Sequence, residues 1–303
     1  MIDPWQRHAR APRLMRVLVT GAAGKLGVAT VRALVQAGFE VRATDQRYTA
    51  ELGVPFRTAN LLDEHALYPL LEGVDALVHL GNHPNRFAGP SPQRILSENV
   101  AMNANAFQAA LDLGVRHVVF ASSIQVMITS DRVRTEPHTL PYLPLDGEAP
   151  GDPGLNPYAL SKQFGEEYLR TAASVRPELA ATAVRYPMLV SDWFEKRLAA
   201  DGGRVRRDAL HLGEATAHLS FEDAGALVVP LLRRGGPGYR QIFPAQTIDV
   251  TNLPPPELIR RFYPGVRCKK PVETIDRLID ISDVERDFDW QPKEQPRVVL
   301  VEP

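Results

Sequence analysis

The sequence predicts a doubly wound α/β fold, in which parallel strands alternate with helices that cover both faces of one sheet. Three observations support this prediction. Short apolar runs alternate with helical patterns through the first half of the chain. The runs are apolar throughout, which indicates strands that are buried on both faces. A glycine-rich turn at 21–27 directly follows the first run, where a doubly wound sheet of the Rossmann type carries its first strand-to-helix turn.

The first half of the chain predicts short strands that alternate with helices. Strands are expected at 16–20, 40–44, 76–80 and 117–121, with a weaker one at 56–59, and helices at 25–37, 64–71 and 94–113. A further helix is expected after the cap residue Asn156, because Pro157 suits the first helical position. Six prolines interrupt the periodic pattern at 130–157, which we therefore expect to be a long surface loop.

The alternation decays after residue 184, and a smaller lobe of mixed structure is expected to follow. We assign 1–14 to a disordered leader, 15–186 to the Rossmann-type domain and 187–303 to the small lobe. The chain is expected to cross back, with a helix at 221–234 and a strand at 239–243 in the first domain. A further helix is expected at 255–262.

Composition excludes several classes of protein. The chain has 303 residues, of which 44% are hydrophobic and 23% charged, so a sizeable core is expected. A net charge of -1 gives no overall attraction to nucleic acid or an anionic membrane, and no apolar run approaches the roughly 20 residues that span a bilayer. The single cysteine, Cys268, allows neither an internal disulfide nor a cysteine-based zinc site. We expect a cytoplasmic protein with no metal.

The glycine-rich turn has the properties of a pyrophosphate-binding loop. Gly21 allows the tight turn, Gly24 lets the backbone approach a ligand, and Gly27 lets the helix pack on the strand. The following helix presents unpaired N–H groups to phosphates. The turn also contains Ala23, Lys25 and Leu26. Three glycines also occur in purely structural turns, so the context of strand and helix carries this prediction.

An acidic residue at the end of the second strand indicates which dinucleotide binds. Asp45 lies eighteen residues after Gly27, where a carboxylate accepts hydrogen bonds from the adenosine ribose and repels a 2′-phosphate. The sequence therefore favours NAD. Two alternatives stay open: Asp45 as a solvated turn residue, and NADP bound with the help of Arg42 and Arg47.

A tyrosine and a lysine share one face of the helix after Asn156. Tyr158 and Lys162 are four residues apart, which is one helical turn. An ammonium beside a phenol favours the phenolate and lowers the phenol pKa from about 10. Such a pair can take a proton from a hydroxyl group near neutral pH. Alone, this spacing usually marks a surface pair, and the dinucleotide turn is what favours catalysis here.

Together these motifs resemble the extended short-chain dehydrogenase/reductase family, which contains nucleotide-sugar epimerases, dehydratases and related sugar dehydrogenases. The resemblance covers residue 15 to the C-terminus and is strongest up to residue 185. The matching pieces are TGAAGKLG at 20–27, VHLG at 78–81, Asn99-Val100 with Asn105, ASS at 121–123, and Tyr158 with Lys162. Locally, 158–166 and 120–123 also resemble uronate dehydrogenases, which act on free sugars.

The resemblance implies a role for each matching residue. Ser123, three residues before Val126, would hold the reacting oxygen against Tyr158. The structural alternative, a serine that caps the strand end, suits Ser122 better. Lys162 would also hold the nicotinamide ribose, and Asn99 would support the geometry of the site. The cofactor-binding set gains Asn60 and Leu61 near the adenine, Leu80 and Gly81 along the channel, and Pro187. His79 is expected to be structural. The resemblance also implies a homodimer paired through helices 94–113 and 158–172.

Three functions stay open. The leading one is an NAD-dependent epimerase or oxidoreductase acting on a sugar or nucleotide-sugar hydroxyl; its alternative is a free-sugar or uronate dehydrogenase that releases NADH. Dehydratase chemistry is disfavoured, because dehydratases of the family carry an Asp-Glu pair after the catalytic Ser/Thr and this chain has Ile124 and Gln125. The third function is a dinucleotide-binding regulator, although such a protein would be expected to lose Ser123, Tyr158 and Lys162.

Overall fold

A computed structural model of the chain describes residues 14–85, 89–128, 140–190, 204–205, 215, 217–247, 249–250, 253–293 and 298–301. The predicted leader and part of the proline-rich stretch lie outside these residues. No helix among the described residues has the length and apolar character to cross a bilayer.

Seven strands form one parallel sheet in the order β10-β6-β5-β4-β1-β2-β3. The order reverses between β1 and β4, as the doubly wound prediction requires. The strands are β1 (Arg16–Thr20), β2 (Glu40–Asp45), β3 (Phe56–Thr58), β4 (Ala76–His79), β5 (His117–Ser123), β6 (Ala180–Tyr186) and β10 (Gly238–Ile242). The predicted α/β fold class is confirmed.

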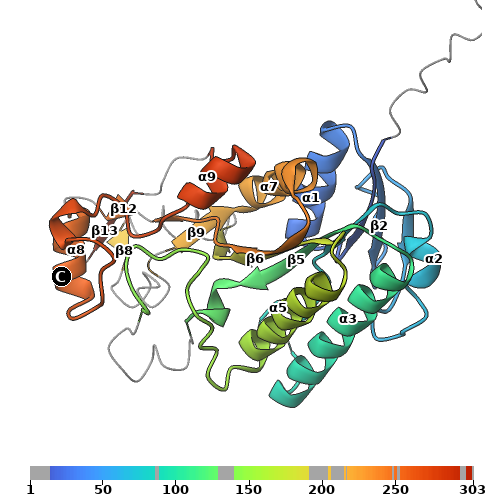
Figure 1. Ribbon diagram of the computed structural model, residues 1–303, viewed down its shortest axis with the longest axis horizontal. Helices are drawn as coiled ribbons and strands as arrows, with labels where there is room; N and C mark the ends of the chain where they lie inside the picture. Colours follow the sequence, from blue (N-terminus) through green and yellow to red (C-terminus); the bar gives the residue numbers. More distant parts are fainter. Residues whose placement is uncertain are drawn as a thin grey trace, which may run out of the picture.

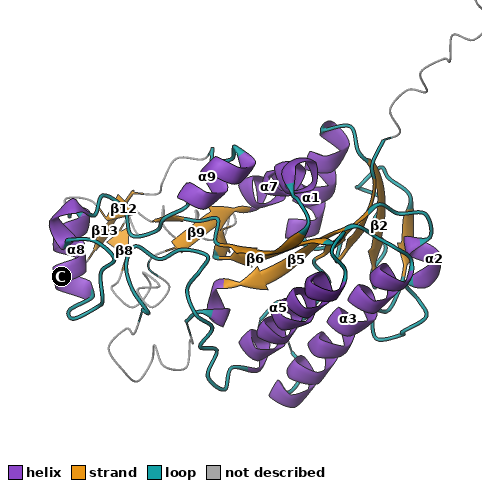
Figure 2. Cartoon of the chain, in the orientation of Figure 1, coloured by secondary structure: helices purple, strands orange, loops and turns teal. Residues whose placement is uncertain are grey.

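Helices cover both faces of this sheet (Figures 1 and 2). On one face lie α1 (Lys25–Gln36), α7 (Phe221–Arg234) and α9 (Ser282–Phe288), and on the other α2 (Tyr68–Leu71), α3 (Pro92–Asp112) and α5 (Pro157–Val175). Alternation along β1 explains the two layers: Val17 and Val19 pack in one hydrophobic cluster with α1 and α7, while Leu18 packs in the other with α3 and α5.

Several predicted boundaries shift for local reasons. The helix predicted at 64–71 is shorter, because residues 63–66 form a turn and α2 begins only at Tyr68, before Pro69. By contrast α3 begins before the predicted residue 94, because the Ser91 hydroxyl caps it by accepting a hydrogen bond from Arg94 N (3.4 Å) and Pro92 occupies its first position.

The smaller lobe contains two short three-stranded sheets. One joins β7 (Met188–Val190), β9 (Ala217–Ser220) and β11 (Gln246–Thr247) in mixed orientation. The other joins β8 (Arg204–Val205), β12 (Asp249–Val250) and β13 (Val298–Val301), near α8 (Pro255–Phe262) at one end of the molecule (Figure 1). The 3-10 turns η1 (Ile124–Val126) and η4 (Val272–Thr274) complete the described elements. The division at residue 187 stays a prediction.

The prediction of a surface loop is wrong for residues 140–149. Leu143, Leu145 and Ala149 are buried without exposed surface, because this segment pairs with the C-terminal lobe. Leu143 N donates to Arg267 O (2.9 Å), and Leu145 N donates to Leu278 O (2.8 Å). Apolar residues at 140, 142, 143 and 145 supply the side chains for this packing.

Candidate active site

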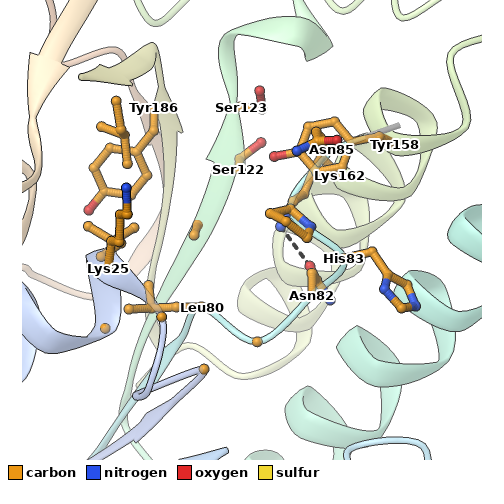
Figure 3. A pocket seen from close by; sticks show the side chains of 18 of the residues that line it. Lys25, Leu80, Asn82, His83, Asn85, Ser122, Ser123, Tyr158, Lys162 and Tyr186 are labelled. Carbon is orange, nitrogen blue, oxygen red and sulfur yellow. Dashed lines mark hydrogen bonds between the residues drawn. The ribbon is translucent and has the colours of Figure 1, made fainter. Parts of the chain in front are cut away.

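A cavity of about 770 Å³ opens at the carboxyl ends of β1, β4, β5 and β6. This edge, beside the reversal of strand order, is where doubly wound sheets bind ligands. Most of the predicted site residues line it (Figure 3), namely Gly21, Gly24, Lys25, Leu26, Gly27, Asp45, Leu61, Leu80, Gly81, Ser123, Tyr158, Lys162 and Pro187. The structure therefore brings the glycine-rich turn and the Tyr158–Lys162 pair to one cavity.

The glycine-rich turn is packed so closely that side chains cannot replace its glycines. Gly21 has a φ of +66°, and a Cβ there would lie 2.8 Å from Gly81 N. A Cβ on Gly27 would lie 2.6 Å from Ala22 Cα and also collide with the Gly21 carbonyl oxygen. Gly24 caps α1 with no side-chain cap hydrogen bond, which leaves the helix end to a ligand. This cradle fits a dinucleotide pyrophosphate.

Replacing Gly27 with alanine is expected to destabilise the fold by about 1–3 kcal/mol, as overpacking does, and to abolish NAD binding. Urea unfolding and isothermal titration calorimetry measure the two effects. Gly236→Ala is the matched control, because a Cβ at Gly236 meets nothing within 4 Å. A Gly27→Ala variant that binds NAD as the wild type does would contradict the role of this close packing.

Asp45 connects the second strand to the glycine-rich turn. Its Oδ2 accepts a hydrogen bond from Ala23 N (3.1 Å), and its Oδ1 accepts one from Arg47 N (3.3 Å). Arg47 lines the cavity, whereas Arg42 donates to the Glu72 carbonyl oxygen (2.9 Å) beside α2. Asn60 is not at the cavity wall; its Oδ1 accepts from Leu62 N (3.1 Å) and shapes the turn after β3. Ala23 is likewise absent from the cavity wall, and its backbone N–H holds the Asp45 carboxylate.

A buried chain of hydrogen bonds runs beneath the cavity floor. The Thr20 hydroxyl accepts from Gly81 N (3.2 Å) and donates to His79 Nδ1 (2.8 Å). His79 Nε2 donates to Asn103 Oδ1 (3.0 Å), and Asn103 Nδ2 donates to Ser161 O (3.3 Å) on α5. Burial, followed by the charge of Lys162, lowers the pKa of His79 to about 3, so the ring is neutral. This chain fixes the glycine-rich turn relative to α5.

Ser123, Tyr158 and Lys162 line the same cavity, Ser123 from β5 and the other two from α5 (Figure 3). Ser123 ends β5, and its Oγ accepts from Gln125 N (3.2 Å) at the start of η1. Lys162 Nζ lies 5.6 Å from the centre of the Tyr158 ring. Burial lowers the pKa of Lys162 to about 7. The arrangement places a hydroxyl, a phenol and an amine on the wall of one cavity.

The prediction that Ser122 caps the end of the strand is wrong. Ser123 provides the cap, while the Ser122 hydroxyl donates to Glu166 Oε1 (2.6 Å). Glu166 also accepts from Arg185 Nη2 (2.7 Å), and both side chains of this ion pair are 3% exposed. Arg185 Nη1 donates to the carbonyl oxygens of Gly147 (3.0 Å) and Ala149 (2.6 Å). The pair joins α5, β6 and the 140–149 segment behind Ser123.

Asn99 is buried and does not line the cavity. Its Oδ1 accepts from His83 N (2.8 Å), and its Nδ2 donates to His83 O (3.3 Å) and Ser161 Oγ (3.1 Å). Asn99 therefore clamps the segment after β4 to α5. In this position Asn99 can support the geometry of the site, but it does not reach a ligand in the cavity.

The structure adds residues that the motifs did not indicate. The cavity is also lined by Gln46, Asn82, His83, Asn85, Gln125, Tyr186, Met188 and Leu189. For Asn82 a signal was present, because it follows Gly81 at the carboxyl end of β4, where ligand-binding side chains gather. Among the described residues, no group of three or more His, Cys, Asp or Glu could hold a metal ion.

Comparison with known proteins agrees with this geometry. The family model "NAD dependent epimerase/dehydratase family" matches residues 17–215. A uronate dehydrogenase of Pseudomonas putida is 31% identical over 159 residues, which are 50% of this chain and 53% of that protein. An L-arabinose 1-dehydrogenase (NAD(P)(+)) of Haloferax volcanii is 34% identical over 158 residues, which are 50% of this chain and 59% of that protein. The chain thus spans little more than half the length of these relatives.

The fold has equally clear relatives among solved structures. A UDP-glucose 4-epimerase of Thermotoga maritima matches with a TM-score of 0.67 at 18% identity, covering 93% of this chain and 94% of the other. At this identity the likeness shows the fold alone. The family match covers the first two thirds of the chain and includes the glycine-rich turn, Ser123, Tyr158 and Lys162. The chain therefore belongs to the NAD dependent epimerase/dehydratase family.

Proposed function

We propose that this protein oxidises a hydroxyl group of a sugar with NAD as hydride acceptor. The observation that carries the proposal is that Ser123, Tyr158 and Lys162 line the same cavity as the glycine-rich turn. The family is NAD dependent by description, and the matched relatives include a uronate dehydrogenase and an L-arabinose dehydrogenase.

Each residue has a distinct task in this proposal. The Ser123 hydroxyl holds the substrate oxygen against the phenol of Tyr158. The Tyr158 oxygen removes the hydroxyl proton, and the nearby Lys162 ammonium favours the phenolate that does so. Bound NAD supplies the acceptor for the hydride that leaves the same carbon. Asn99, Glu166 and Arg185 position these groups through α5 and the strand ends.

The fate of the hydride separates the two enzyme classes. Release of NADH would make the protein a dehydrogenase, and the two matched dehydrogenases support this class. Return of the hydride to the opposite face of the sugar would make it an epimerase, and a UDP-glucose 4-epimerase is also among the matched relatives. Ile124 and Gln125 follow Ser123, and neither is an acid or a base that could eliminate water. We therefore do not favour a dehydratase.

Two measurements on the purified protein test this proposal. Nucleotide is first extracted and identified by mass spectrometry, and NADH formation at 340 nm is then followed with neutral sugars, uronates and UDP-sugars. An empty protein that reduces added NAD with a free sugar supports the dehydrogenase. Tightly held NAD with interconversion of sugar epimers supports the epimerase. Binding of NAD without turnover of any sugar supports the dinucleotide-binding regulator.

Asp45→Asn is expected to relax the preference for NAD over NADP. The substitution removes the negative charge that opposes a 2′-phosphate, and a change of about 1.4 kcal/mol would shift the ratio of the two Kd values about tenfold. Titration calorimetry with both nucleotides measures the ratio. Glu40→Gln removes the same charge at the far end of β2 and serves as control. An unchanged ratio in Asp45→Asn would sink the assignment of Asp45 to the adenosine ribose.

The homodimer stays a prediction. The helices expected to pair, α3 and α5, lie side by side on one face of the sheet (Figure 1). Phe164 on α5 is 51% exposed, which is compatible with burial in a partner. Light scattering after size exclusion measures the mass directly.

A further inference from the structure

Lys162 has an unusual partner for a buried amine. Its Nζ donates to Asn82 Oδ1 at 2.6 Å (Figure 3), and its ammonium lies 4.8 Å from the centre of the Phe120 ring. Lys162 as a whole is 3% exposed. Among the ion pairs of the described residues, none includes Lys162, so the carbonyl oxygen of a neutral amide takes the place of a carboxylate.

The orientation of the Asn82 amide is fixed by chemistry. An ammonium has only donors, so the amide oxygen must face Lys162 and the amide nitrogen must turn away. That nitrogen is buried and has no hydrogen-bond partner among the described residues. A buried donor without a partner is costly, which indicates that the position serves the site rather than the stability of the fold.

The backbone around Asn82 is held in place from both sides. On one side Gly81 N donates to Thr20 Oγ1 (3.2 Å). On the other side the Asn99 side chain bonds both the N–H and the C=O of His83. Asn82 therefore cannot follow Lys162 if the lysine moves, and it provides a fixed acceptor at the boundary between the glycine-rich turn and α5.

We propose that Asn82 is the positioning residue for Lys162: its fixed carbonyl oxygen holds the lysine amine beside Tyr158 and favours its charged form over the neutral one, with or without a cofactor. The inference rests on the proposed function only where it links the Lys162 charge to proton removal by Tyr158. The charge state of Lys162 is a property of the protein alone and can be measured without turnover.

Other charged groups near Lys162 do not replace this contact. His79 on β4 is neutral, as its lowered pKa requires. Glu166, one turn further along α5, is engaged by Arg185 of β6 and by Ser122. Tyr158 and His83 also line the cavity, and the His83 ring pairs with Glu98 (2.7 Å) on α3. Burial lowers the pKa of Lys162 to about 7, and a hydrogen bond that the ammonium donates opposes that shift.

The test is a direct titration of Lys162 by NMR. The chain has six lysines, so protein labelled with ¹³C-lysine gives few Cε signals, and Lys162→Arg identifies the one from Lys162. In Asn82→Ala the midpoint is expected to fall by about one pH unit, so that at pH 7 the charged fraction drops from about one half to about one tenth. In Asn82→Asp the midpoint is expected to rise, because a carboxylate replaces the amide.

Asn85→Ala is the matched control, because Asn85 lies in the same segment and lines the same cavity. It is expected to leave the Lys162 midpoint unchanged. Midpoints in Asn82→Ala and Asn82→Asp that both equal the wild-type value would overturn the inference, and Asn82→Asp keeps the test valid if Asn82→Ala does not fold. If the midpoints move as expected while no sugar is oxidised, the proposed function fails and the role of Asn82 stands.

Discussion

Tyr158→Phe is expected to lower kcat for sugar oxidation by about 10²–10⁴-fold, the range that a general base contributes. The substitution removes one oxygen atom and keeps the ring that lies beside Lys162. NAD affinity should change little, because the glycine-rich turn and Asp45 are untouched. Steady-state kinetics at saturating NAD, together with calorimetric NAD binding, separates the two effects.

The same helix provides a control for this prediction. Tyr168 lies on α5, and its hydroxyl donates to Gln108 Oε1 (2.8 Å) on α3, at an exposed position. Tyr168→Phe should therefore leave kcat unchanged. A loss of less than tenfold in Tyr158→Phe would show that another group removes the proton. A Tyr158→Phe protein that keeps its full biological effect would instead favour a regulator.

Arg185→Met is expected to destabilise the folded state by about 3–5 kcal/mol, which is the cost of leaving one member of a buried ion pair without its partner. The substitution leaves the Glu166 carboxylate buried and removes the donors to the carbonyl oxygens of Gly147 and Ala149. The temperature of unfolding should fall by about 10 °C for a chain of this size. Urea unfolding and calorimetry measure both quantities.

Two further variants sharpen this test. Arg260 pairs with Glu273 on the surface, where the side chains are 58% and 70% exposed, so Arg260→Met should cost less than about 1 kcal/mol. The double variant Glu166→Gln/Arg185→Met removes both buried charges and should recover part of the loss. An Arg185→Met protein as stable as the wild type would mean that the ion pair contributes nothing net to the fold.

The sequence predicted those parts of the site that depend on local patterns. Periodicity located β1, α7 and α8 at their observed bounds, and the one-turn spacing of Tyr158 and Lys162 placed both at the cavity. Contacts between distant segments were beyond such patterns. Asn82 and Lys162 are 80 residues apart, and no pattern in the sequence around either residue indicates that the two are in contact. Proline content likewise suggested a surface loop at 140–149, although the partners that bury it lie at 267–269 and 278–280.

The pairing of the 140–149 segment has a consequence for how the site forms. Leu143 bonds to Arg267 and Leu145 to Leu278, so each link closes a loop of well over one hundred residues. Contacts between such distant residues raise the contact order of the protein. Folding is then slower, because the entropy of closing the loop is lost before the contacts stabilise the chain. The same segment accepts the Arg185 hydrogen bonds behind Ser123. The ends of β5 and β6 therefore gain their full support only when the C-terminal quarter of the chain has docked.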